Sequence, residues 1–147
     1  MGFLNALNIS ASGMTAQRMR LDVAAANITN INTTRTENGE PYRRKMVVFE
    51  SIEGNSFEDA FRSKLSKSNQ LPGGVRVAEI VEDQSDFRSV YNPEHPDADE
   101  NGYVQMPNVD LLKETVDSMA ASRAYEANLT AFNTVKSMAV KALEIGK

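Results

Sequence analysis

The sequence predicts a mainly α-helical protein with a small β insert, in which an N-terminal and a C-terminal helix form an antiparallel, coiled-coil-like pair. Apolar residues repeat at helical spacing through residues 1-32, and residues 108-147 contain no proline. All five prolines fall in residues 33-107, where short runs alternate with turn residues. Helical spacing of apolar residues is distinct from the alternation that marks a strand. We therefore expect the chain to be organised into these three regions.

The N-terminal helix is predicted from residue 3 to about residue 31. Its apolar residues are spaced alternately three and four apart, a heptad pattern that favours packing against another helix. Arg18 is the one charged residue on this stripe. The helix should end in the run from Asn27 to Thr34, because Asn and Thr side chains compete for backbone hydrogen bonds. The large stripe residues, which we expect to pack, are Leu4, Leu7, Met14, Leu21 and Ile28.

The middle region is predicted to contain a short β-hairpin in otherwise irregular chain. Asn38-Gly39 is favoured in tight hairpin turns, since both central residues need a positive φ angle. Met46–Phe49 and Val75–Val81 are predicted strands. The polar residues 53-74 are predicted to form a mobile loop, in which residues 57–65 could make a short helix.

The C-terminal helix is predicted from Val109 to about Ile145. Pro93, Pro96 and Pro107 predict a rigid, irregular stretch before it, and Asn108 is the expected N-cap. At 1.5 Å per residue the helix could be ~57 Å long. Its apolar residues fall on two adjacent stripes, one small and one bulky, which one partner helix cannot cover. The residues expected at packing contacts are Val116, Met119, Tyr125, Leu129, Phe132, Val135, Met138 and Leu143.

The surplus of apolar surface on these helices predicts self-assembly. Burial of one stripe would give roughly 12 to 20 kcal/mol of gross stabilisation. Ordering about 30 backbone residues costs ~1 to 2 kcal/mol each. One pair of such helices would therefore be marginal, and other copies of the chain are the simplest source of further contacts. The alternative is a helical hairpin that caps the β insert inside an ordinary monomer.

Composition narrows the function classes. The chain has 147 residues, no cysteine and a net charge of -4, and the charge is concentrated in an acidic middle region. A nucleic-acid-binding protein would need a concentrated basic face. No apolar run is long enough to span a bilayer, and the N-terminus does not have the pattern of a secretory signal. We expect a soluble structural protein without a cofactor.

Residues 97–102 have the first half of a calcium-binding loop. Asp97, Asp99, Asn101 and Gly102 match D-x-D-x-N-G, the opening of a helix-loop-helix site. Asn108 stands where the closing glutamate belongs, so we expect a hydrogen-bonded turn and no metal site.

Two further features receive structural interpretations. His95 is the only histidine, and no nucleophile-elbow pattern surrounds a serine, so we do not expect an enzyme. Tyr42–Lys45 contains the only basic run, and it is predicted to be a solvated strand end, with contact to an acidic partner surface as the alternative.

Several motifs resemble those of the axial proteins of the bacterial flagellum, and the resemblance covers nearly the whole chain. It departs at Thr29, where the signature more often has alanine, and at Asp86, where proline is frequent. The segments that carry the resemblance are Ser12–Gln17, Ala25–Thr33, Pro41–Lys45, Val90–Asp99, Gly102–Val104, Met106–Val109 and Ser122–Asn128. The signature positions are Ala26, Asn27, Asn30, Asn32, Thr33, Asn92, Pro93, His95, Pro96, Asp97, Gly102, Tyr103, Pro107 and Asn108.

The resemblance implies a structural subunit of the flagellar basal-body rod, a helical tube that transmits motor torque for cell motility. Implied partners are other copies, neighbouring rod proteins, the basal hub protein and the type III export apparatus. Export without a cleaved signal would place the chain outside the cytoplasm, in the periplasm or cell-wall space. The alternative is a soluble helical module that binds calcium or a partner protein.

Overall fold

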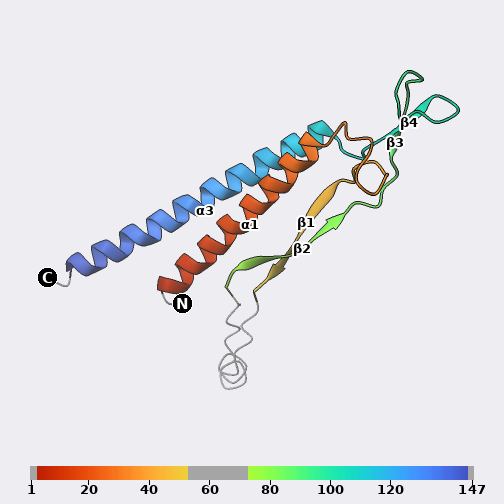
Figure 1. Ribbon diagram of the computed structural model, residues 1–147. Coiled ribbons are helices and arrows are strands. Elements are labelled where there is room, and N and C mark those ends of the chain that lie inside the picture. The colour runs from red at the N-terminus through yellow and green to blue at the C-terminus, as the bar shows by residue number, and fades with distance from the viewer. Residues whose placement is uncertain (1–2, 53–72, 146–147) are drawn as a thin grey trace, which may run out of the picture. The chain divides into compact units, whose positions relative to one another are not determined.

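The computed structural model describes residues 3–52 and 73–145, and two long helices enclose a small β insert in its element order (Figure 1). This confirms the predicted fold class. The predicted loop over residues 53-74, with its short helix, lies almost entirely outside the described residues. The elements are α1 (Phe3–Thr29), β1 (Lys45–Ser51), β2 (Val75–Glu82), β3 (Arg88–Tyr91), β4 (Tyr103–Met106) and α3 (Leu111–Ile145).

Helix α1 ends at Thr29, inside the Asn- and Thr-rich run that predicts its end. The Asn30 backbone N–H donates to the Ala26 carbonyl over 3.1 Å, and the Asn30 side-chain amide donates to the same carbonyl over 2.9 Å. The Thr33 hydroxyl donates to Asn30 Oδ1 over 3.2 Å. These contacts satisfy the last turn locally and direct the chain away from the helix axis.

Helix α3 is capped by Asp110, so the prediction that Asn108 caps it was wrong. Asp110 Oδ1 accepts hydrogen bonds from the backbone N–H groups of Leu112, over 2.9 Å, and Lys113, over 3.4 Å. Asn and Asp are equally good caps, and Pro107, one residue before Asn108 and three before Asp110, does not select between them. Asn108 is used elsewhere, as described below.

The strands form two separate two-stranded sheets, β1 with β2 and β3 with β4. The first sheet contains both predicted strands. In the second, the strands pair antiparallel from Arg88 opposite Met106 to Tyr91 opposite Tyr103. The prediction of an irregular stretch missed this second pair. Its prolines lie in the connection and after β4, so none occupies a paired position.

A turn forms at Gly39, but it is not the predicted strand-to-strand hairpin turn. Gly39 has a φ of 80°, and its N–H donates to the Thr36 carbonyl over 2.9 Å. No non-glycine residue in the described ranges has a positive φ, so Asn38 does not have the predicted conformation. The Thr36 N–H and hydroxyl both donate to the Glu40 carbonyl, which closes the loop without flanking strands.

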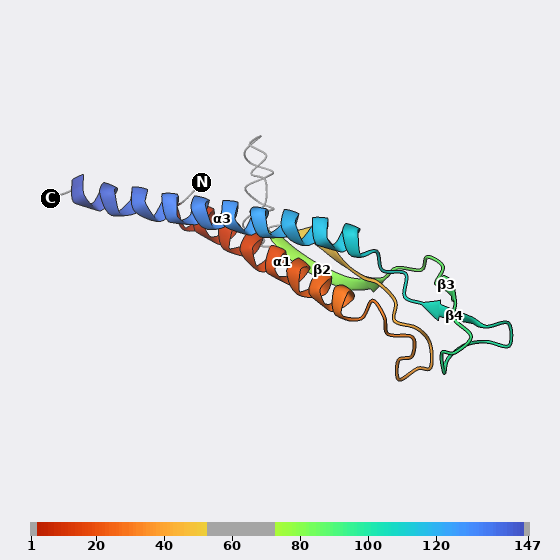
Figure 2. The same cartoon turned by 90° about the horizontal axis from the view of Figure 1, so that it is seen from above.

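The described residues form two compact units, and both helices and the first sheet contribute to each. The first unit contains residues 3–18, 49–52, 73–78 and 122–145, and the second contains residues 19–48 and 79–121. Within each unit, segments of α1 and α3 lie side by side and run in opposite directions (Figures 1 and 2). The second unit has the larger apolar core, made by Val23, Ala24, Val104, Val109 and Ala121.

Candidate assembly site

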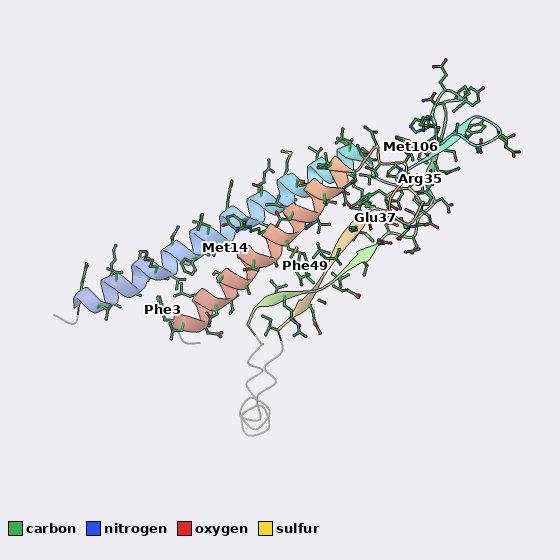
Figure 3. The ribbon with its side chains drawn as sticks, in the orientation of Figure 1. Phe3, Met14, Arg35, Glu37, Phe49 and Met106 are labelled. Atoms are coloured by element: carbon green, nitrogen blue, oxygen red, sulfur yellow. The ribbon has the colours of Figure 1, made fainter. Side chains whose placement is uncertain are left out.

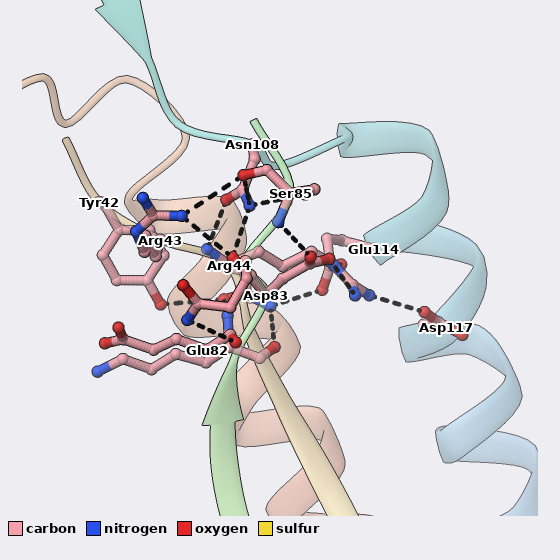
Figure 4. Close-up of polar contacts among 12 residues, drawn as sticks. Tyr42, Arg43, Arg44, Glu82, Asp83, Ser85, Asn108, Glu114 and Asp117 are labelled. Carbon is pink, nitrogen blue, oxygen red and sulfur yellow. Dashed lines mark hydrogen bonds and ion pairs between the residues drawn. The ribbon is translucent and has the colours of Figure 1, made fainter. Parts of the chain in front are cut away.

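A cluster of buried polar side chains lies in the second unit, where α1 ends and α3 begins (Figure 4). Asn27 is 1% exposed, Glu114 2% and Arg44 7%. Polar groups this deeply buried are costly unless each has a partner. We call the group of Asn27, Tyr42, Arg44 and Glu114 the polar cluster.

Asn27 uses its full hydrogen-bonding capacity. Its amide nitrogen donates to the Lys45 carbonyl over 2.9 Å and to Glu114 Oε2 over 3.0 Å. Its amide oxygen accepts from the Lys45 N–H and from the Tyr42 hydroxyl, each over 2.9 Å. An amide side chain can donate two hydrogen bonds and accept two, so Asn27 is saturated. These bonds fix the last turns of α1 against β1 and α3.

Arg44 supplies the positive charge of the cluster. Its Nε donates to Glu114 Oε1 over 2.6 Å. Its other nitrogens lie 3.7 Å from Asp83 Oδ2 and 3.5 Å from Asp117 Oδ2. Asp117 also accepts from Arg20 over 2.9 Å. A buried guanidinium therefore connects the residue before β1, the residue after β2 and the first two turns of α3.

Asn108 fastens the segment before α3 to the strands. Its Oδ1 accepts from the Arg44 N–H over 2.8 Å, and its Nδ2 donates to the Asp83 carbonyl over 3.0 Å and to Ser85 Oγ over 2.9 Å. Hydrogen bonds from the Ser85 backbone and side chain lower the pKa of the Asp83 carboxyl, and nearby Arg44 and Lys113 lower it further. The start of α3 thus has a fixed position relative to the second unit's strands.

Replacing Tyr42 with phenylalanine should reduce the sensitivity of stability to alkaline pH. Burial raises the pKa of the Tyr42 phenol above 10.0, and the carboxylates of Glu114 and Glu82 raise it further. When the pKa of a phenol is higher in the folded state than in the unfolded state, its ionisation does not affect the free energy of unfolding below the unfolded-state pKa. The free energy of unfolding then falls as the pH rises from the unfolded-state pKa through the folded-state pKa. The wild-type free energy of unfolding should fall above about pH 10 by an amount that Tyr42→Phe lacks.

Urea unfolding followed by circular dichroism between about pH 8 and about pH 11 measures this difference. At neutral pH the variant should be less stable by ~1 kcal/mol, because it lacks the hydrogen bond to Asn27. Parallel pH profiles for wild type and variant would contradict the expectation.

The predicted packing residues divide between half-buried and exposed positions. On α1, Leu7, Met14, Leu21 and Ile28 are half-buried, whereas Leu4 is 72% exposed. The most buried apolar residues of α1 lie beside the predicted stripe and include the small Ala16 and Ala24. On α3, Tyr125, Phe132 and Val135 are half-buried, and the exposed residues are Val116, Met119, Leu129, Met138 and Leu143.

Small side chains bring the helices together in the first unit also. Gly13 on α1 lies against Asn128 on α3, where an added Cβ would be 2.9 Å from Asn128 Oδ1. The Ser12 hydroxyl accepts from the Val75 N–H over 3.1 Å. Side chains project along both helices (Figure 3), and the exposed large apolar ones include Phe3 and Leu4 on α1 and Leu129 and Leu143 on α3. Close contact between the helices therefore leaves many large apolar side chains exposed in the part of the chain that the structure describes.

The signature positions do not gather in one place. Asn27 and Asn108 lie in or beside the polar cluster, and Pro107 is buried nearby. Asn30 and Thr33 close the end of α1, whereas Ala26, Asn32 and Pro96 are exposed. The remaining positions belong to the β3–β4 connection and the start of β4, and they are Asn92, Pro93, His95, Asp97, Gly102 and Tyr103.

Glycine is required at position 102 by the β3–β4 connection. Gly102 has a φ of 80°, and an added Cβ would lie 2.9 Å from Tyr91 Cε2. Tyr91 and Tyr103 make an edge-to-face contact with ring centroids 5.4 Å apart. His95 Nδ1 accepts from the Asp97 N–H over 3.1 Å, so the imidazole helps to shape the connection.

Residues 97–102 form a hydrogen-bonded turn. Asp99 Oδ1 accepts from the N–H groups of Asn101, over 2.9 Å, and Tyr103, over 2.8 Å, while Asp97 Oδ2 accepts from the Thr34 hydroxyl over 2.8 Å. Among residues 3–52 and 73–145, no group of three acidic, His or Cys side chains could hold a metal ion.

In the same ranges, no helix is long and apolar enough to cross a membrane.

The structure corrects the interpretation of the basic run. Arg44 is buried against Glu114 and is not a solvated strand end. Arg43 stacks over Phe87, with its guanidinium carbon 4.2 Å from the ring centroid. Neither Glu114 nor its pairing with Arg44 was predicted from the sequence. The available signal was the alternation of side chains along an extended segment, which turns Arg44 to the opposite face from Arg43 and Lys45.

Comparison with known proteins decides the family. The model of the flagella basal body rod protein family matches residues 7–35, and that of the flagellar basal body rod FlgEFG protein C-terminal region matches residues 100–145. The flagellar basal-body rod protein FlgC of Bacillus subtilis is 54% identical over 97% of each chain. The chain belongs to the FlgC family of flagellar basal-body rod proteins. FlgC proteins of Borreliella burgdorferi, over 99% of this chain and 98% of the relative, and of Salmonella typhimurium, over the whole of both, are each 44% identical.

Membership in the FlgC family confirms two predictions. The resemblance to flagellar axial proteins was correct, and the family is structural, so the chain is not an enzyme. The two segments that match family models each contribute to the polar cluster. Asn27 belongs to the first segment and Glu114 to the second, and they are joined by a hydrogen bond of 3.0 Å.

Proposed function

We propose that this chain is a structural subunit of the flagellar basal-body rod and that it assembles with other subunits through the apolar faces of α1 and α3. Membership in the FlgC family supports the structural role and the location in the basal body. The observation that carries the mode of assembly is the exposure of large apolar side chains on both helices. Leu4 on α1 is 72% exposed and Leu143 on α3 is 76% exposed.

The exposed side chains are arranged for contact with other molecules. Val116, Met119, Leu129 and Met138 are each more than two-fifths exposed along α3. Burial of a large apolar side chain contributes ~1.5 to 3 kcal/mol. Cover by neighbouring subunits would therefore stabilise an assembly strongly, since large apolar side chains that are exposed favour contact with other molecules.

The polar cluster supports the mechanical part of the proposal. In a rod that transmits torque, the two helices of each subunit must keep their relative position under load. Arg44, Asn27 and Glu114 connect both helices to β1 through charged and saturated hydrogen bonds, which hold one arrangement more strictly than apolar contacts do. We propose that this cluster stiffens the subunit.

The finer assignment rests on the resemblance. We propose that the subunits form a helical tube, the proximal rod, and that the terminal helices line its inner layer. Its partners would be other copies, neighbouring rod proteins, the basal hub protein and the type III export apparatus. The resemblance further supports export without a cleaved signal to the extracytoplasmic space.

Replacement of Leu4 by aspartate should abolish rod assembly and swimming without unfolding the isolated chain. Leu4 makes little contact within its own chain, so the free energy of unfolding should change by about 0.5 kcal/mol or less. A charge in a subunit interface would be buried without a partner. Swimming in a strain that lacks its own copy of the gene, together with electron microscopy of isolated basal bodies, measures the effect.

Leu4→Met is the matched control, because it preserves the apolar volume and should retain motility. Motility of the Leu4→Asp strain at the wild-type level would count against an assembly role for this face of α1. A chain that neither enters basal bodies nor restores motility in its wild-type form would overturn the proposed function itself.

A further inference from the structure

The only histidine of the chain, His95, takes part in the backbone hydrogen bonding of the β3–β4 connection. Its Nδ1 accepts from the Asp97 N–H over 3.1 Å, and its side chain is 32% exposed. A ring nitrogen of imidazole accepts a hydrogen bond only when it has no proton of its own. The bond therefore places the ring proton on Nε2, and it exists only while the imidazole is neutral.

This hydrogen bond is sensitive to protonation. Histidine is the side chain that ordinarily changes its charge between about pH 5 and about pH 8. When His95 gains a proton, Nδ1 becomes a donor that faces another donor, the Asp97 N–H. The Asp97 N–H then loses its acceptor. Because the imidazole is partly open to solvent, a proton can reach it without unfolding of the connection.

The carboxylate of Asp97 links the connection to the segment between α1 and β1. Its Oδ2 accepts from the Thr34 hydroxyl over 2.8 Å, and its Oδ1 lies 3.8 Å from Arg35 Nη1. Both contacts are made within the second unit. They border a cavity of about 370 Å³ that is lined from one side by residues 34–41 and from the other by residues 96–105. The Asp97 side chain therefore attaches one wall of this cavity to the other.

The imidazole lies close to the same carboxylate. His95 Nδ1 is 4.0 Å from Asp97 Oδ2, the oxygen that accepts from Thr34. A neutral imidazole with its proton on Nε2 has neither a charge nor a donor to offer that oxygen. A protonated imidazole has both, and a hydrogen bond between two ionised groups is stronger than one from a neutral hydroxyl. Protonation therefore sets His95 in competition with Thr34 and Arg35 for Asp97.

The other charges of the two segments do not compete for this role. In residues 30–41 and 92–102, Arg35 is the one arginine or lysine, and it already lies near Asp97 Oδ1. The remaining acidic side chains in those ranges are all exposed, and they are Glu37, Glu40, Glu94, Asp99 and Glu100. Asp99 Oδ1 also accepts from the backbone N–H groups of the turn. Asp97 is thus the carboxylate placed to pair with the imidazolium.

We propose that His95 is a proton-operated switch in the β3–β4 connection. The neutral imidazole binds the Asp97 N–H and leaves the Asp97 carboxylate to Thr34 and Arg35. The protonated imidazole releases the N–H and draws the carboxylate to itself, which weakens the attachment of the segment between α1 and β1. Every group of the switch belongs to the second unit of one chain, so the inference does not depend on the assembly proposed above.

Nuclear magnetic resonance of the full-length chain, at a concentration at which it stays monomeric, tests the first step. The nitrogen shifts of the His95 ring report its tautomer and its protonation, and amide hydrogen exchange reports the bond to Asp97. The protection of the Asp97 amide, relative to an unstructured peptide at the same pH, should fall about five-fold as His95 is protonated, because one hydrogen bond is lost. Protection that does not follow the protonation of His95 would overturn the proposal.

His95→Asn is the matched control for this step. The asparagine Oδ1 lies at nearly the position of the imidazole Nδ1, accepts a hydrogen bond and does not titrate. Protection of the Asp97 amide should therefore stay constant between about pH 8 and about pH 5.5. A loss of protection equal to that of the wild type would identify another group as the sensor and reject the switch. If circular dichroism shows that the variant is unfolded, the wild-type titration alone decides.

Asp97→Asn tests the movement of the carboxylate. The change keeps the size of the side chain and removes its charge, so the imidazolium no longer attracts it. In the wild type, the amide resonances of Thr34 and Arg35 should shift together with the protonation of His95, and in Asp97→Asn these shifts should be lost. Shifts of equal size in both proteins would overturn the proposed competition for Asp97.

Discussion

Replacing Glu114 with alanine should lower the free energy of unfolding by about 3–5 kcal/mol, because it leaves the Arg44 guanidinium buried without its main counter-charge. Arg44 is 7% exposed and donates to Glu114 over 2.6 Å, whereas its other acidic neighbours are more than 3.4 Å away. Urea unfolding of the full chain, followed by circular dichroism, measures the loss. The variant should also accumulate poorly in cells.

The chain contains a matched control for this prediction. Glu50 and Arg76 form an ion pair of 2.8 Å whose side chains are both more than half exposed. Glu50→Ala should therefore cost only ~0–1 kcal/mol. Replacing both buried partners, as Arg44→Met with Glu114→Leu, should recover much of the loss, since no charge is then stranded. Equal costs for Glu50→Ala and Glu114→Ala would contradict the role of burial.

Asn27→Asp should lower the free energy of unfolding about as much as Glu114→Ala does, although asparagine and aspartate side chains have nearly the same shape. The change removes both donated hydrogen bonds, to the Lys45 carbonyl and to Glu114, and it sets a second carboxylate 3.0 Å from Glu114 Oε2. Two carboxylates at this separation cannot both remain ionised in a buried site. We expect a loss of about 3 kcal/mol or more at neutral pH.

The pH dependence distinguishes charge repulsion from a general packing defect. Acidification toward about pH 5 should narrow the gap between Asn27→Asp and wild type, because protonation of one carboxyl removes the repulsion and restores a donor. Asn8→Asp is the control on the same helix, since Asn8 is exposed and should change stability by less than about 0.5 kcal/mol. A gap that stays constant with pH would show that repulsion is not the cause.

The elements with strong local signals were predicted well from the sequence. The heptad spacing before Asn27 and the proline-free run after Pro107 gave both helices, and β-branched runs gave β1 and β2. The pair β3 and β4 was missed because its strands have only four residues each and are surrounded by prolines. Alternation over so few residues is too short to separate strand from loop.

The polar cluster could not be predicted from the sequence because its partners are distant in the chain. Arg44 and Glu114 are 70 residues apart, and each is an ordinary charged residue in its local pattern. Asn27 and Asn108 were marked by the family resemblance, which gives no reason for their residue type. Only tertiary contact shows that an amide fits a site that demands two donors and two acceptors.

The sequence predicted that both helices have surplus apolar surface, but not which residues are exposed. The surplus of apolar residues was visible in the sequence, whereas the assignment of Leu4 or Leu143 to exposed positions required the structure. The heptad rule selects large residues for the contact between helices. In the second unit the most buried apolar residues of the two helices include the small Ala24 and Ala121, and a hydrogen bond between Asn27 and Glu114 joins the helices. Small side chains allow helices to approach more closely than large ones do.

Because the Asn27 side chain makes all the hydrogen bonds it can, turnover of the rod is affected. Every hydrogen bond of that side chain ends inside the same polypeptide, so no neighbour completes the joint between the helices. A subunit released from a dismantled rod would keep this joint intact and expose only its outer apolar faces. Disassembly and reuse would therefore require no refolding of the joint.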